Sequence, residues 1–199
     1  ITAIGNTLYF SADDGTIGAE LWKSDGTASG TVMVKDINGG YGSSYPPLLT
    51  AVGNTLYFQA DDGTNGEELW KSDGTASGTV MVKDIYSGSS SSTPYSLTAV
   101  GNTLYFQADD GSNGYELWKS DGTASGTVMV KDINNGSDDS NPHRLKAVGN
   151  TLYFLADDGT HGKELWKSDG TASGTVMVKD INNGSASGIS TNPGSSTNF

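Results

Sequence analysis

Short apolar runs alternate with clusters of Gly, Asn, Asp and Ser along the whole chain. The run Thr7 to Ala12 is followed by turn formers, then by Ala19 to Ser24, and after a second cluster by the β-branched run Thr31 to Ile37. A shorter run, Ile1 to Ile4, precedes them across a Gly-Asn pair. Short runs bounded by turn-forming residues are typical of β-strands. The pattern therefore predicts units of four strands joined by tight turns.

This unit is written four times. The segment ELWKSDGTASGTVMVKDI at residues 20–37 recurs unchanged at 68–85, 116–133 and 164–181, which is a period of 48 residues. A Gly-Asn connection favours a two-residue hairpin turn, because both residues tolerate positive φ, so neighbouring strands should be antiparallel. Copies arranged around an axis cover the faces that a single sheet would expose.

The sequence thus predicts an all-β fold, a β-propeller of four 48-residue blades, each a four-stranded antiparallel meander with its first strand nearest the axis. We expect blades at approximately residues 1–47, 48–95, 96–143 and 144–184, and a C-terminal tail or linker at 185–199. A larger ring completed by two chains is the alternative to closure by four blades alone.

Charge narrows the range of partners. The chain has 23 acidic and 11 basic residues and a net charge of -12. Nucleic acids and anionic membranes attract clustered Lys and Arg, so neither is an expected partner. There is no cysteine, which excludes disulfides and thiolate chemistry. No apolar run approaches the length of a membrane span.

Each unit places three carboxylates around a Gly-rich turn, and hard cations such as Ca²⁺ prefer several oxygen ligands. The candidate metal ligands are Asp13, Asp14, Glu20, Asp61, Asp62, Glu68, Asp109, Asp110, Glu116, Asp157, Asp158 and Glu164. The alternative is that each Asp pair only caps its turn through nearby backbone amides. Ca²⁺ is the one cofactor that the sequence suggests.

The repeated tryptophans allow two interpretations, and the repeated lysines suggest one. Trp22, Trp70, Trp118 and Trp166 occupy identical contexts, which favours packing between blades over stacking on sugars. Sugar binding through the variable loops, which carry Tyr41, Tyr45, Tyr86 and Tyr95, stays open. Lys23 and Lys35 are expected to pair with acids across strands at the rim.

Catalysis has little support, and we expect no enzyme. The two histidines, His143 and His161, have no counterpart in the other copies. Glycoside hydrolysis needs two carboxylates in different environments, whereas fourfold copying supplies similar ones.

The motif Glu20 to Thr27, ELWKSDGT, with its three copies, resembles the ELWxxDGT repeat family of large bacterial secreted and surface proteins. The resemblance covers about residues 1–184 and implies a β-propeller in an extracellular or cell-surface setting. It implies no catalytic residue. We therefore expect a non-enzymatic structural or adhesive module, a bead of a surface fibre that self-associates head-to-tail. The alternative is a lectin-like, carbohydrate-binding propeller assisted by calcium.

Overall fold

The computed structural model of the protein describes residues 1–189, and these fold into four antiparallel four-stranded sheets without a helix. The first sheet contains β1 (Thr2–Ile4), β2 (Thr7–Asp13), β3 (Ala19–Ser24) and β4 (Val32–Lys35). The second contains β5 (Thr50–Val52), β6 (Thr55–Asp61), β7 (Glu67–Ser72) and β8 (Val80–Lys83). The third contains β9 (Tyr95–Val100), β10 (Thr103–Asp109), β11 (Tyr115–Ser120) and β12 (Val128–Lys131). The fourth contains β13 (His143–Val148), β14 (Thr151–Asp157), β15 (Lys163–Ser168) and β16 (Val176–Lys179). The all-β prediction and the four-stranded meander of each unit are confirmed.

Each sheet follows the chain order, so every strand pairs with its sequence neighbour. The Gly-Asn hairpin forms as predicted: Ile4 pairs with Thr7, and Gly5 has a φ of 57°. The fourth strand is shorter than expected because the amide of Ile37 donates to Glu20 Oε2 at 3.0 Å instead of joining the ladder. The polar residues after the fourth strand then lead to the first strand of the next sheet.

Apolar side chains from consecutive sheets form three equivalent cores. In the first core, Tyr9, Leu21, Val34 and Ile37 of the first sheet pack against Leu56, Phe58, Ala60 and Trp70 of the second. The same positions 48 and 96 residues later form the other two cores. Each junction therefore packs one face of a sheet against a face of the next sheet, so that a central sheet buries both of its faces. This explains why the apolar runs are continuous rather than alternating.

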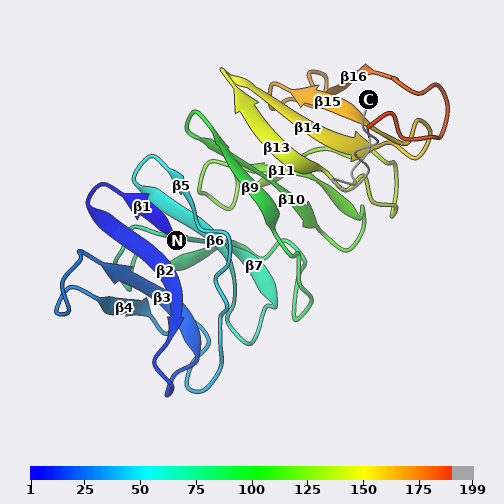
Figure 1. Ribbon diagram of the computed structural model, residues 1–199. Coiled ribbons are helices and arrows are strands. Elements are labelled where there is room, and N and C mark those ends of the chain that lie inside the picture. The colour runs from blue at the N-terminus through cyan, green and yellow to red at the C-terminus, as the bar shows by residue number, and fades with distance from the viewer. Residues whose placement is uncertain (190–199) are drawn as a thin grey trace, which may run out of the picture.

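The first strands of consecutive sheets lie side by side, β1 with β5, β5 with β9 and β9 with β13. Figure 1 shows the sheets following one another from the first at lower left to the fourth at upper right, with these two at opposite ends of the array. Within residues 1–189 the four sheets thus form an open row and not a ring closed by the chain itself. No helix among these residues could cross a membrane, since the described chain has none.

Residues 185–189 continue the pattern of the earlier inter-sheet loops. The Gly188 amide donates to Glu164 Oε1 at 2.7 Å, as the Ser44 amide does to Glu20 Oε1 at 3.0 Å in the first unit. The predicted tail therefore begins inside the repeat, and its remainder, residues 190–199, lies outside the described residues.

Candidate functional site

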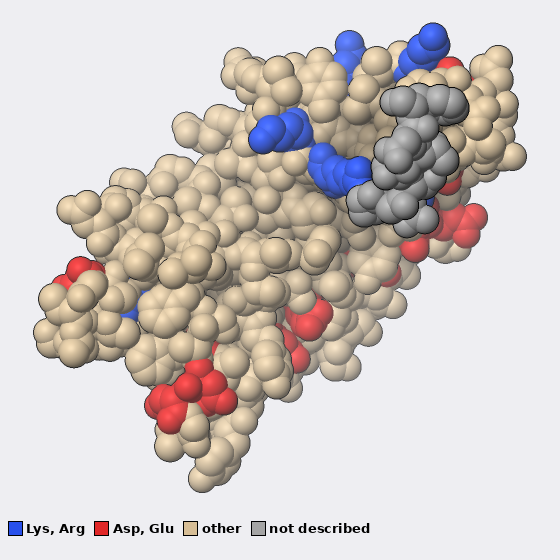
Figure 2. Space-filling model, viewed as in Figure 1, with Lys and Arg blue, Asp and Glu red and all other residues tan. Residues whose placement is uncertain are grey.

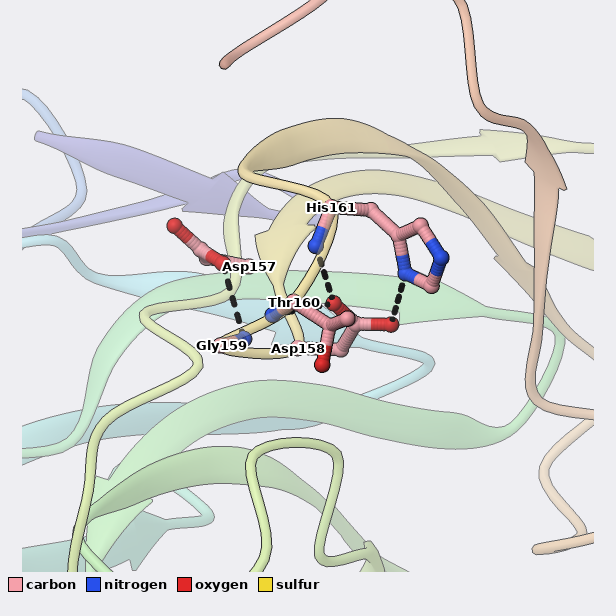
Figure 3. Close-up of polar contacts among 5 residues, drawn as sticks. All are labelled: Asp157, Asp158, Gly159, Thr160 and His161. Carbon is pink, nitrogen blue, oxygen red and sulfur yellow. Dashed lines mark hydrogen bonds and ion pairs between the residues drawn. The ribbon is translucent and has the colours of Figure 1, made fainter. Parts of the chain in front are cut away.

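The Asp pairs cap the turn between the second and third strands of each sheet. In the fourth sheet the Gly159 amide donates to Asp157 Oδ1 at 2.9 Å, and the Thr160 and His161 amides donate to Asp158 Oδ1 at 3.0 and 2.9 Å (Figure 3). Equivalent bonds hold the turns after Asp13, Asp61 and Asp109. These side chains act as turn caps, because each supplies an acceptor for amides two or three residues further on.

The third candidate ligand of each unit lies apart from this turn, inside the sheet junction. Glu116 is fully buried and accepts four bonds: from the Ile133 amide (2.9 Å), the Asn134 amide (3.4 Å), the Ser140 amide (3.0 Å) and the Ser140 hydroxyl (2.6 Å). Glu20 and Glu68 hold the loops after their own sheets in the same way. The glutamates therefore fix the loop that leads to the next sheet.

That loop is also tied to the next sheet. The Ser140 carbonyl accepts from the Asp157 amide at 3.0 Å, and Ser44 and Ser92 bind Asp61 and Asp109 in the same manner. Buried glutamate, loop serine and the end of the following second strand thus form one chain of hydrogen bonds across each junction. A serine at a constant offset of 24 residues from each of the first three glutamates is the sequence signal that would have revealed this role.

The predicted metal ligands are consequently not gathered around one point. Within residues 1–189 no cluster of three or more His, Asp or Glu side chains has a metal-binding arrangement. Figure 2 shows acidic side chains in separate groups along one edge of the array rather than in one continuous patch. Calcium binding stays a prediction that only the Asp turns could carry.

Burial and hydrogen bonding shift the acidic groups in opposite directions. Burial raises the pKa of Glu116 to about 7 and raises that of Glu68 as well, despite the donors around both carboxylates. Hydrogen bonds from Thr27 lower the pKa of Asp25 at the Asp-Gly turn. At the fourth Asp pair, the hydrogen bond that Asp158 Oδ2 accepts from His161 Nδ1, at 2.8 Å, raises the pKa of His161.

The lysines join sheets instead of pairing with acids across strands. Lys23 Nζ donates to the Gly74 carbonyl of the second sheet at 2.7 Å, and Lys35 Nζ donates to the Thr79 carbonyl at 2.8 Å. Lys35 Nζ also lies 5.6 Å from the centre of the Trp70 ring, within range of a cation–π interaction. The two hydrogen bonds and the cation–π contact recur at the next two junctions, so each lysine links consecutive sheets.

The tryptophans of the second, third and fourth sheets are buried, which confirms their packing role. Trp70, Trp118 and Trp166 are 5–6% exposed. Trp22 in the first sheet is half-buried, and no other described sheet covers it. A sugar could not stack on the three buried indoles without displacing the junction.

A shallow groove recurs beside the Asp-Gly turn of every sheet. In the first sheet it encloses about 450 Å³ between the strands carrying Thr7, Lys23 and Val32 and the turn at Asp73 of the second sheet. Grooves with the same Thr, Lys, Asp and Val positions lie on the other three sheets, and we call these four the rim grooves. Each valine is 37–40% exposed, so every groove combines an exposed apolar side chain with polar ones.

A separate groove of about 360 Å³ lies between the first strands of the second, third and fourth sheets. Its lining includes Leu48, Ser96 and Arg144, which are equivalent positions with left-handed φ values of 51–57°. Such φ values are uncommon for residues other than glycine. The three side chains differ between copies, so this groove is lined in part by variable positions, whereas the rim grooves are lined by residues that are the same in every copy.

Comparisons with known proteins agree on the fold and give no family. No family model matches the chain, and no curated protein matches it significantly. The chain is similar to the crystal structure of the computationally designed Ika8 protein, with 18% identity and a TM-score of 0.52, over 94% of this chain and 50% of that one. It is also similar to a puromycin hydrolase mutant complexed with PGG (14% identity, TM-score 0.59, 88% and 27% of the two chains). A third similar structure is oligopeptidase B from Leishmania major (12% identity, TM-score 0.52, 86% and 25%).

The chain thus spans half of the designed protein and about a quarter of each hydrolase. At these identities the similarity concerns the arrangement of the sheets alone.

Proposed function

We propose that the four sheets are blades of a β-propeller and that the protein is a non-enzymatic structural or adhesive module of the extracellular space or cell surface. The observation that carries this proposal is the use of the repeated polar residues. The buried glutamates, the Asp turns and the linking lysines all hold one sheet to itself or to the next. A scaffold requires such residues, whereas an enzyme requires a set of groups that breaks the repetition.

The resemblance to ELWxxDGT repeats, together with the acidic, cysteine-free composition, supports the proposed extracellular or cell-surface setting. Adhesion or fibre formation would use the array as a rigid unit displayed by a larger surface structure. Antibody labelling of intact producing cells tests the location: we expect signal at the surface or in the medium, and signal only after permeabilisation contradicts it.

Thermal unfolding in the presence of a panel of surface polysaccharides, nucleotides and peptides tests the structural role. A scaffold should keep its unfolding midpoint with every compound, since ligands that bind only the folded state raise it. A reproducible shift with any compound contradicts a purely structural function and identifies the ligand class.

The second candidate is carbohydrate binding, which the four rim grooves favour. Repeated weak sites gain strength when a polymeric ligand contacts several of them at once. Microcalorimetry with polysaccharides, with and without calcium, should then give heat that falls by about half when Val80 and Val128 are replaced by Arg to fill two of the four grooves. Unchanged binding in that variant excludes the grooves as the site.

A further inference from the structure

The two ends of the array expose the two halves of the junction that recurs inside it. We define the leading face as Leu8, Phe10, Ala12 and Trp22 of the first sheet, and the trailing face as Tyr153, Leu165, Val178 and Ile181 of the fourth. Equivalent residues of the other sheets form the three internal cores. The sequence of each face is therefore matched to the other, although the two lie at opposite ends (Figure 1).

The leading face is open where its internal counterparts are closed. Leu8 is 41% exposed, whereas Leu56, Leu104 and Leu152 are fully buried. Phe10 and Trp22 are half-buried, while Phe106 and Trp118 in the third sheet are buried. A strand that differs from its counterparts at one position thus presents an apolar surface that the other described sheets do not cover.

The trailing face shows the same contrast. Val178 is 47% exposed and Ile181 is 54% exposed, against 6% and 7% for the equivalent Val130 and Ile133. Exposed apolar surfaces of this kind, flanked by polar residues, mark interaction sites. In the first three sheets, the residues equivalent to the trailing face are covered by the Leu, Phe, Ala and Trp positions of the next sheet, and these are the positions that form the leading face of the first sheet.

Polar groups at the two ends are complementary as well. Inside the array, Lys131 Nζ donates to the Thr175 carbonyl at 3.0 Å and lies 5.6 Å from the centre of the Trp166 ring. At the trailing end the equivalent Lys179 is exposed. At the leading end, the residues equivalent to Thr175 and Trp166 are Thr31 and Trp22, and both are half-buried. A leading face thus supplies the carbonyl and the indole that the lysine of a trailing face would contact.

We propose that the leading face of one chain packs against the trailing face of a second copy, with Lys179 of one chain bonded to Thr31 and placed over Trp22 of the other. The proposal rests on the proposed function in treating the sheets as blades. The occupant is a second copy because three internal junctions show the same residues packed together. Pairing two leading faces would bring indole to indole and leave both lysines without the contact seen inside the array.

Such a contact is heterologous, since each partner contributes a different face. Heterologous contacts generate a ring when the rotation closes and an open filament when it does not. Either form would convert a row of four sheets into a larger assembly through the residues of the leading and trailing faces alone. The surface fibre expected from the sequence is one outcome of this geometry, and the larger two-chain ring is the other.

Light scattering coupled to gel filtration tests the contact with two single variants. Leu8→Asp disables the leading face and Val178→Asp disables the trailing face, each at a position exposed in the single chain. The wild type should have at least twice the chain mass of 20.6 kDa, and each variant alone should be a monomer. A 1:1 mixture should form a heterodimer, because one intact leading face then meets one intact trailing face.

Val32→Asp is the matched control. Val32 is 40% exposed, like its equivalents in the three other sheets, so no junction covers it and association should be unaffected. A folded wild-type monomer at high concentration overturns the proposal, as does association of either disabled variant by itself or failure of the two to combine. Circular dichroism separates this from failure of the blade assignment: an intact β spectrum in a monomer leaves the proposed function standing, while loss of it does not.

Discussion

Replacing Phe106 by Ala and, separately, Phe10 by Ala compares one residue in two copies of the same strand. Both lie in the sequence TLYF followed by one variable residue and ADDG, so intrinsic strand propensity is equal. Phe106 is fully buried in the core shared by the second and third sheets, whereas Phe10 is half-buried at the leading end. The comparison isolates the contribution of the neighbouring sheet.

Removal of a fully buried phenylalanine costs about 3–5 kcal/mol, because the lost transfer free energy and the cavity add together. The half-exposed ring already contacts water, so Phe10→Ala should cost about half as much. Both changes are made in the Val178→Asp background, which prevents a second copy from covering Phe10. The expected difference in the free energy of unfolding is about 2 kcal/mol.

Chemical denaturation followed by circular dichroism and tryptophan fluorescence measures this difference. Arrays of repeats can unfold in steps, so both probes are fitted to a nearest-neighbour scheme rather than to a single transition. Phe106→Ala should lower the stability of the two central sheets most. Equal losses in the two variants would refute the packing of consecutive sheets as the source of stability.

Three further predictions concern the polar residues and turns. Because burial raises the pKa of Glu116 from 4.5 to about 7, the protonated Glu116 contributes its full stabilisation below about pH 4.5, and this contribution of about 3 kcal/mol is lost as the pH rises to about 7. Denaturation curves recorded over this pH range should show the loss in the wild type and not in Glu116→Gln. Gly74→Ala should destabilise the protein by about 1 kcal/mol more than Gly26→Ala. Both glycines have a φ near 90°, but only at Gly74 does the new methyl group meet the Tyr9 hydroxyl across the junction, so equal shifts of the melting midpoint in the two variants would contradict this. Calcium added to chelator-treated protein should leave the melting midpoint unchanged if the Asp pairs are turn caps alone, and a rise would establish a metal site.

The strands could be predicted from the sequence because their positions depend on short apolar runs and on Gly-containing turns between residues that are close in sequence. The predicted range of residues 19–24 is that of β3, and the Gly-Asn hairpins have the expected pairing. The β-branched run extends to Ile37, but β4 ends at Lys35, since the Ile37 amide is bonded to a glutamate 17 residues earlier. A local pattern cannot reveal a partner that only tertiary structure brings near.

The candidate site was less accessible for the same reason. Asp13 and Glu20 lie close in sequence, but one caps a turn at the strand end and the other is directed into the sheet junction. The linking role of Lys23 depends on a carbonyl 51 residues away. Closure of a ring depends on the angle between consecutive sheets, and four identical copies of a motif do not specify that angle.

An experimental structure of the assembled protein is the most direct test of the claim that one junction is used both within and between chains. The account predicts that the indole of Trp22 lies beneath the Lys179 ammonium of a neighbouring copy, in the arrangement that Trp70 and Lys35 adopt within the chain. A structure in which Trp22 faces solvent, or in which two leading faces meet, would contradict it.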